Sequence, residues 1–190
     1  MMKYEMMIPP FDRVEFIDMN KKQAQEYFEW YIGQIDYRIS LLLNNIKEDG
    51  IDTNFDYSIE SLIPLWEWYE RKISYRKIDE SEYQLRICKH PEWMKDYIAE
   101  TDLSWETLMY CMDVALYFAE VMIRHNDNIK WGFFTKPKNR SGVNQPVLLG
   151  FKYDMDLNPR LIVENCTRRS GKEMLKTRLY DMYFTWMKYI

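Results

Sequence analysis

The chain has 190 residues, 47% of them hydrophobic, with 7 Trp, 15 Tyr and 9 Phe; this length suits one domain, and the composition excludes a disordered chain. Its 3 Cys exclude a closed disulfide framework, and its 2 His and 6 Gly leave few parts for metal chemistry or phosphate-binding loops. The net charge of -4 and the pI of 5.4 are opposite to the basic footprint of a dedicated nucleic-acid binder.

The start of the chain, MMKYEMMIPPF, lacks the apolar stretch of a signal peptide, and no run of about 18 residues is apolar enough to cross a membrane. An odd number of cysteines favours a reducing compartment. We therefore expect one domain, residues 1–190, in the cytoplasm and without membrane contact.

The first strong pattern predicts a long amphipathic helix between Asn20 and Gly50. Asn20 and Gln23 have the spacing of a capping box, and Gly50 is a typical helix stop. Apolar residues recur every three or four positions, which predicts one buried face and a solvated opposite face. The expected buried face consists of Ala24, Phe28, Tyr31, Ile35, Ile39, Leu42 and Ile46.

The next segment predicts one helical turn, residues 58–62, and then a helix with Pro64 at its first position. Trp66 and Trp68 are two residues apart and cannot share a helix face, so we expect one of them at the surface or at an interface. Residues 74–92 are dense in charge and lack periodicity, which predicts an irregular, mobile connection.

A helix over residues 104–125 is expected to lie in the middle of the domain. Ser104 is a good N-cap, and apolar residues cover nearly the whole circumference. Beyond it, two short aromatic and β-branched runs flank a loop with Gly, Pro and Asn, which predicts a hairpin within residues 129–153. The fold class is therefore α+β: a mostly helical domain in which a small antiparallel sheet packs on the central helix.

Two helices are expected after the hairpin. Asn158 and Pro159 form a cap-plus-first-turn signature, although the composition of residues 159–166 would also suit a strand, so helix and strand stay open there. The chain ends on a last apolar stripe, formed by Leu175, Leu179, Tyr183, Trp186 and Ile190.

The charges are divided along the chain. Residues 1–128 hold 14 Lys and Arg against 25 Asp and Glu, a net charge of -11, whereas residues 129–190 hold 12 against 5, a net charge of +7. The two parts could neutralise each other on packing, or two basic loops could form a face for an acidic partner or a phosphate backbone. That face would contain Lys136, Lys138, Arg140, Arg168, Arg169 and Lys172, with Trp131, Phe133 and Phe134 as a stacking platform.

Asp113 and Glu120 are the acids inside the apolar central helix, and so they are the first catalytic candidates. They share a face, but seven residues separate them by about 10.5 Å, which exceeds the roughly 6.5–9.5 Å of an inverting glycosidase pair. We expect Glu120 to pair with Arg124, and Asp113 to bond a Tyr hydroxyl, a Trp indole or a backbone group. The functional alternative is that one of them lines a polar pocket.

Neither metal nor cofactor binding is expected. His90 and His125 have no second ligand at zinc-site spacing, and no cysteine has a C-x-x-C partner. The acidic run before Pro159 resembles a calcium loop, but proline stands where the loop needs glycine.

The order of LWEWY, DVALYFAEVMIRHN, KWGFFTKP, NQPVLLGF and Asn158-Pro159 resembles that of uncharacterised bacterial proteins of unassigned function. It is similar, more loosely, to small α+β bacterial domains in which a helix ending in Gly-Glu precedes a Trp-bearing strand; Ala119-Glu120 stands at that place here. The similarity spans roughly residues 60–190. Several such families look like immunity proteins of bacterial toxin systems, which implies a non-enzymatic protein that binds a toxin.

Three functions follow as hypotheses. The leading one is a non-enzymatic protein-binding module, with toxin neutralisation as its concrete form. The alternative is an enzyme or small-ligand binder with a pocket where the central helix meets the sheet, using Asp113 or Glu120. The third is weak binding of single-stranded nucleic acid by residues 129–190. Homo-oligomerisation stays open.

Overall fold

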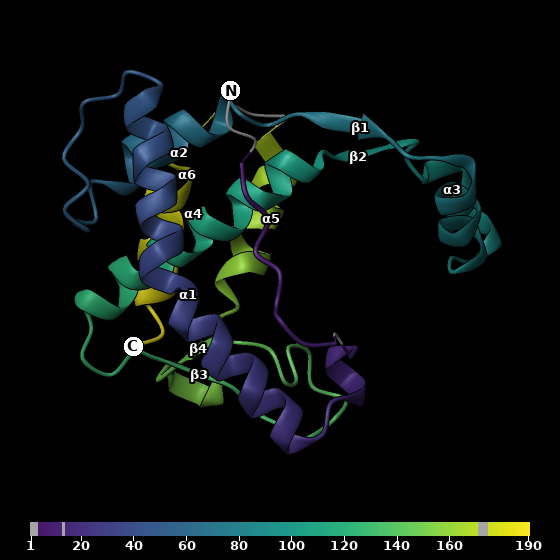
Figure 1. Ribbon diagram of the computed structural model, residues 1–190. Helices are drawn as coiled ribbons and strands as arrows, with labels where there is room; N and C mark the ends of the chain where they lie inside the picture. The colour runs from purple at the N-terminus through teal and green to yellow at the C-terminus, as the bar shows by residue number, and fades with distance from the viewer. Residues whose placement is uncertain (1–3, 13, 171–174) are drawn as a thin grey trace.

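The central helix of the sequence analysis, α4 (Trp105–Arg124), is the axis of the fold in the computed structural model, which describes residues 4–12, 14–170 and 175–190 (Figure 1). Ser104 caps it by accepting a hydrogen bond from the backbone N–H of Thr107 at 3.1 Å. The remaining elements are η1 (Phe16–Asp18), α1 (Lys21–Glu48), α2 (Leu62–Glu70), β1 (Tyr75–Lys77), α3 (Glu80–Cys88), η2 (Glu92–Tyr97), β2 (Thr101–Leu103), β3 (Lys130–Gly132), β4 (Val147–Leu149), η3 (Lys152–Asp154), α5 (Pro159–Ser170) and α6 (Arg178–Met187).

The predicted mostly helical α+β class is confirmed. Helices α1, α2 and α5 pack against α4, and α6 packs against α2 and α5, so the apolar circumference of α4 is covered from several sides. Residues 159–166, left open between helix and strand, belong to α5. Asn158 caps this helix through the backbone N–H of Leu161. Among the described residues, no helix combines the length and the apolar character needed to span a membrane.

Helix α1 has the predicted start and a slightly different buried face. The side chains of Asn20 and Gln23 each accept a hydrogen bond from the other residue's backbone N–H, both at 3.0 Å, which confirms the capping box. Tyr27 takes the buried place expected for Phe28, which is only half-buried. Arg38 is also buried, and the apolar pattern did not predict it.

Helix α2 corrects the prediction that Trp66 or Trp68 lies at the surface. Both are fully buried, because α4 packs on one side of this short helix and α6 on another. Trp68 meets the ring of Tyr110 edge-on at 5.2 Å and donates from Nε1 to Asp49 at 2.7 Å. Pro64 is the third residue of the helix rather than the first, since the helix begins at Leu62.

The predicted hairpin within residues 129–153 is present as β3 and β4, which pair antiparallel with Trp131 opposite Leu148. Its aromatic residues pack on α1: the rings of Trp131 and Tyr31 are 5.7 Å apart, and those of Phe133 and Phe28 are 5.1 Å apart. The chain leaves β4 through Gly150, which has φ of 111°. A Cβ atom there would collide with the backbone of Asn128, so only glycine fits.

Residues 74–92 are not the irregular connection that the sequence predicted. Together with residues 93–103 they form an arm, in which β1 and β2 pair antiparallel and run out from the body, with α3 at the far end (Figure 1). Asp79 caps α3 by accepting from the backbone N–H of Glu82 at 2.8 Å. No residue of α3 is buried, and its three large apolar residues, Tyr83, Leu85 and Ile87, are too few to make a clear stripe.

Candidate functional site

The structure places the candidate acid Asp113 in a closed, buried cluster. Its carboxylate accepts two hydrogen bonds from Arg38, at 2.9 and 2.7 Å, and a third from the hydroxyl of Tyr4. Arg38 also donates to the backbone carbonyl of Glu5 at 2.7 Å. Burial raises the pKa of Asp113, and the Arg38 guanidinium opposes that rise. The tyrosine partner was expected; the arginine was not, and the cluster joins the N-terminal segment to α1 and α4.

Glu120, the second candidate acid, lies where β3 meets α4. It accepts from the indole Nε1 of Trp131 at 3.2 Å, and Arg124 lies 3.9 Å away, one helical turn on, as expected. Both carboxylates thus have partners within the fold. The geometry gives them structural roles and does not join them in one site.

The basic residues proposed as a binding face fall into two groups, those in ion pairs and those without one. Arg140 binds Asp154 and Asp156 and lies over the ring of Phe134 at 4.4 Å, and Arg168 binds Asp102 and Glu164. By contrast, Lys136, Lys138 and Arg169 are exposed and form no ion pair with any residue of the described ranges. Lys172 lies outside the described residues.

These residues do not gather on one face. Arg140 binds Asp156, just before α5 starts, whereas Arg168 is in the last turn of α5, a helix of 12 residues and so about 18 Å long. Trp131 and Phe133 are half-buried against α1 and are not free to stack on a ligand. Two ion pairs between described residues, Arg168 with Asp102 and Lys176 with Glu67, instead join the basic part of the chain to the acidic part.

The arm carries the apolar surface that the sequence analysis missed. Leu85, Trp93 and Tyr97 are 62%, 73% and 84% exposed, on an element that projects from the body (Figure 1). Large apolar side chains exposed on one projecting element are candidates for an interaction site, because large exposed apolar patches often mark such sites. The signal in the sequence was the pair of aromatic residues inside a charged stretch that has no apolar periodicity.

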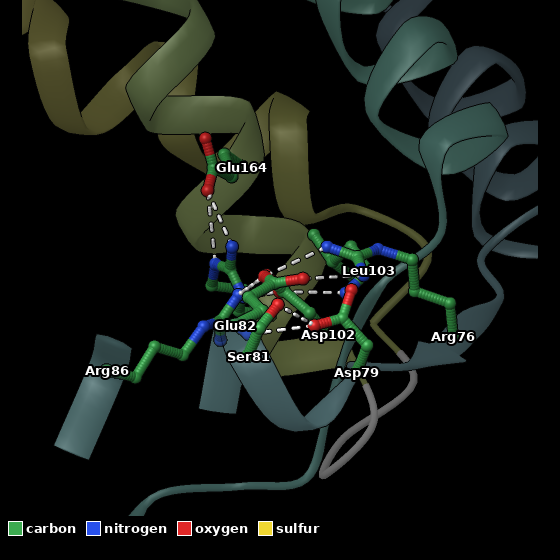
Figure 2. A network of polar contacts seen from close by, with 9 residues as sticks. Arg76, Asp79, Ser81, Glu82, Arg86, Asp102, Leu103 and Glu164 are labelled. Atoms are coloured by element: carbon green, nitrogen blue, oxygen red, sulfur yellow. Dashed lines mark hydrogen bonds and ion pairs between the residues drawn. The ribbon is translucent and has the colours of Figure 1, made fainter. Parts of the chain in front are cut away.

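A cluster of charged side chains fixes the arm to the body (Figure 2). Arg76 and Arg86 both bind Glu82 of α3, and Arg86 and Arg168 both bind Asp102 of β2. Burial acts against ionisation of Asp102, but the hydrogen bonds from the two arginines outweigh it and lower the pKa of Asp102 to about 2. Because Arg168 belongs to α5, this cluster connects the arm directly to the core helices.

Hydroxyl groups complete the attachment at the root of the arm. Thr107 of α4 is buried and accepts from the backbone N–H of Ser74 at 2.9 Å, while Ser104 donates its backbone N–H to the carbonyl of Ser74, also at 2.9 Å. The side-chain oxygens of Ser74 and Ser104 lie 2.7 Å apart. The first residue of the arm is therefore hydrogen-bonded to the start of the central helix, and the last residue, Leu103, directly precedes the cap of that helix.

The described residues contain no group of three or more His, Cys, Asp or Glu side chains that could hold a metal ion. His90 bonds the carbonyl of Arg86 through Nδ1 at 2.7 Å, and His125 caps the C-terminus of α4. Cys111 is buried, and burial raises the pKa of its thiol to about 12, so it is not a thiolate nucleophile at neutral pH.

No protein-family model, no curated protein and no solved structure matches this chain.

Proposed function

We propose that this protein is a non-enzymatic protein-binding module and that it contacts its partner through the arm, residues 74–103. The observation that carries the proposal is the exposure of Leu85, Trp93 and Tyr97 on the arm. Large aromatic side chains dominate the energetics of protein interfaces, because they bury much area and lose little conformational entropy.

The attachment of the arm supports this function. The ion-pair cluster around Asp102 and the hydrogen bonds of Thr107 hold a long, mostly exposed element in one position. An element fixed before binding loses less entropy on association than a flexible loop would. The arm thus combines exposed anchors with a preorganised support.

The negative charge of the first part of the chain favours a basic partner. The arm belongs to the acidic part of the chain, residues 1–128, whose net charge is -11. A positively charged protein would be attracted to this part by long-range electrostatics, which raises the association rate more than the final affinity. The resemblance to immunity proteins makes a basic bacterial toxin the first partner to test.

Nucleic-acid binding by residues 129–190 has less support, because Arg140 and Arg168 are engaged in ion pairs and the nearby aromatic rings pack on α1. A steep dependence of RNA binding on salt concentration would be the observation in its favour.

The test is affinity capture from an extract of the source cell with three forms of the protein. The double variant Trp93→Ala/Tyr97→Ala removes the two anchors, and Tyr153→Ala is the matched control, since Tyr153 is equally exposed but lies on the body. We expect a basic protein to be captured by the wild type and the control and lost by the double variant. The purified partner should then show a Kd raised by at least about 30-fold, the size typical of losing one interface hot spot.

Two results would overturn the proposal. One is a partner that binds the double variant as tightly as it binds the wild type. The other is self-association of the wild type, seen by analytical ultracentrifugation and abolished in the double variant, because the anchors would then join two copies of this chain.

A further inference from the structure

A groove on the opposite side of α4 from α2 is rich in methionine. It lies between α4, α5 and the N-terminal segment and has a volume of about 270 Å³. An adjoining hollow of about 90 Å³ reaches from it toward α1. Both are lined by Met7, Met112 and Arg160, and together they are called the methionine groove below.

The floor of the methionine groove is an apolar stripe of α4 that the core leaves uncovered. Trp105, Leu108, Met109 and Met112 follow one another at helical spacing, and all of them are exposed or half-buried. Methionine is flexible and polarisable, and so it suits the apolar part of a ligand whose shape is not strictly defined. The floor therefore favours a ligand with an apolar tail.

Arg160 supplies a positive charge that the protein leaves unused. It is half-buried in the first turn of α5, and no described residue gives it a hydrogen bond or an ion pair. The other charged groups beside the groove are already engaged: Arg38 with Asp113, and Glu164 with Arg168. An unpaired guanidinium beside apolar surface is a natural partner for a carboxylate, which it can bind with two hydrogen bonds.

Tyr31 supplies a second donor at the same end. Its side chain is 4% exposed, and among the described residues its hydroxyl has only the sulfur of Met112 as a hydrogen-bond partner, at 3.8 Å. A thioether is a weak acceptor, so this buried hydroxyl retains most of its capacity to donate. Burial raises the pKa of Tyr31, so its hydroxyl stays protonated at neutral pH, and Arg160 lines the same hollow.

We propose that the methionine groove binds a small apolar acid. The carboxylate accepts hydrogen bonds from the guanidinium of Arg160 and the hydroxyl of Tyr31, and the tail lies along Leu108 and Met109. The volume is close to the lower end of the roughly 300–1,000 Å³ of small-molecule sites, which limits the ligand to a short chain or a single ring. Cys111 lines the groove as a buried thiol, so the site binds its ligand without covalent chemistry.

Octanoate is the probe, and methyl signals of methionine report where it binds. With the methyl groups labelled with ¹³C, the signals of Met109 and Met112 should shift on titration, and those of methionines outside the groove should stay in place. Acetate, which lacks the tail, and octan-1-ol, which lacks the charge, should each bind at least about tenfold more weakly.

The variant Arg160→Gln should raise the Kd for octanoate at least about tenfold, the size of one lost charge-assisted hydrogen bond. Arg169→Gln is the matched control, because Arg169 is on the same helix, forms no ion pair with a described residue, and does not line the groove. Both variants remove exposed or half-exposed charge, and so both should unfold at the wild-type temperature without ligand.

The proposal is overturned if octanoate causes no shift at millimolar concentration, or if shifts spread over methionines outside the groove. It is equally overturned if octan-1-ol binds as tightly as octanoate, or if Arg160→Gln and Arg169→Gln leave the Kd unchanged alike.

Discussion

The body and the arm of this protein are held together by different forces. In the body, side chains as large as Trp66, Trp68 and Phe118 are fully buried between helices. In the arm, α3 buries none of its residues and only Ile78 and Leu103 are buried apolar side chains, while ion pairs around Asp102 and hydrogen bonds to Thr107 join the arm to the core. Hydrophobic burial depends little on pH and is not screened by salt, whereas partly exposed ion pairs weaken as the salt concentration rises and as their carboxylates become protonated.

This difference explains how the arm can be held in one position and still keep apolar side chains exposed for binding. A packed helix would have to hide its aromatic side chains to gain stability, but the arm gains its position from charges at its root and leaves the apolar side chains of its far part exposed. We expect the arm to open locally at a lower free energy than the body unfolds, as is usual for elements with few buried contacts. Four predictions test this contrast, from the largest effect to the smallest.

The largest effect is expected inside the body, where Arg38→Met should lower the free energy of unfolding by about 3–5 kcal/mol. The substitution leaves the buried carboxylate of Asp113 without its counter-charge. Urea denaturation measures this loss. The double variant Arg38→Met/Asp113→Leu is the control, and it should be more stable than the single variant; if it is less stable, the cost does not come from an unpaired charge.

The second largest loss of stability is expected in the hairpin of β3 and β4. Gly150→Ala is expected to cost more than about 1 kcal/mol, because alanine is strained at positive φ and its Cβ would strike the backbone of Asn128. Gly33→Ala is the matched control: nothing lies near its Cβ in the middle of α1, so it should stabilise by about 1 kcal/mol. Thermal unfolding of both variants measures these effects. Equal changes in the melting temperature would contradict the structure of the hairpin.

The attachment of the arm should depend on pH through Asp102. Its pKa is lowered in the folded state, so its contribution is complete above the ordinary carboxyl pKa of about 3.9 and is lost as the pH falls toward about 2. Amide exchange in residues 75–103, corrected for intrinsic rates, should therefore accelerate in this window before that of α4. Asp102→Asn should reproduce the faster exchange at neutral pH, with a loss of about 1 kcal/mol or less in opening free energy.

The smallest effect is expected at the far part of the arm. Trp93→Ala/Tyr97→Ala should change the free energy of unfolding by no more than about 0.5 kcal/mol, because both side chains are exposed. Trp66→Ala, of the same chemistry but buried, should cost about 3–5 kcal/mol. A large loss of stability in the double variant would mean that the arm packs its aromatic residues and does not offer them to a partner.

The same contrast explains which parts of the fold could be predicted. Helices α1 and α4 were predictable, because Asn20 and Ser104 cap them and apolar stripes follow the caps. Helix α5 was not decided, since the cap signal of Asn158 stood beside a composition that would also suit a strand. The arm was not predictable, since three-residue strands and an unburied helix leave no periodicity in the sequence. The burial of both Trp66 and Trp68 depends on α2 being covered on two sides, which no local pattern can show.

The candidate sites were harder to predict from the sequence than the fold was. Arg38 follows Ile35 and precedes Leu42 at the spacing of the buried stripe, so a charge on that face could have been matched with the buried acid Asp113. The methionine groove offered no such signal, because Met7, Met112 and Arg160 are far apart in the sequence and only the packing of α4 beside α5 brings them together.

The buried cluster of Tyr4, Arg38 and Asp113 also constrains the order of folding during synthesis. Its bonds span 75 and 109 residues of chain. At the usual 5–20 residues per second of synthesis, Arg38 leaves the ribosome about 4–15 s before Asp113. During this interval α1 can form as a helix, but its guanidinium must remain hydrated, so its apolar face cannot yet close over a finished core. Helix α1, the first long helix to be synthesised, is thus expected to be among the last elements to pack into the core.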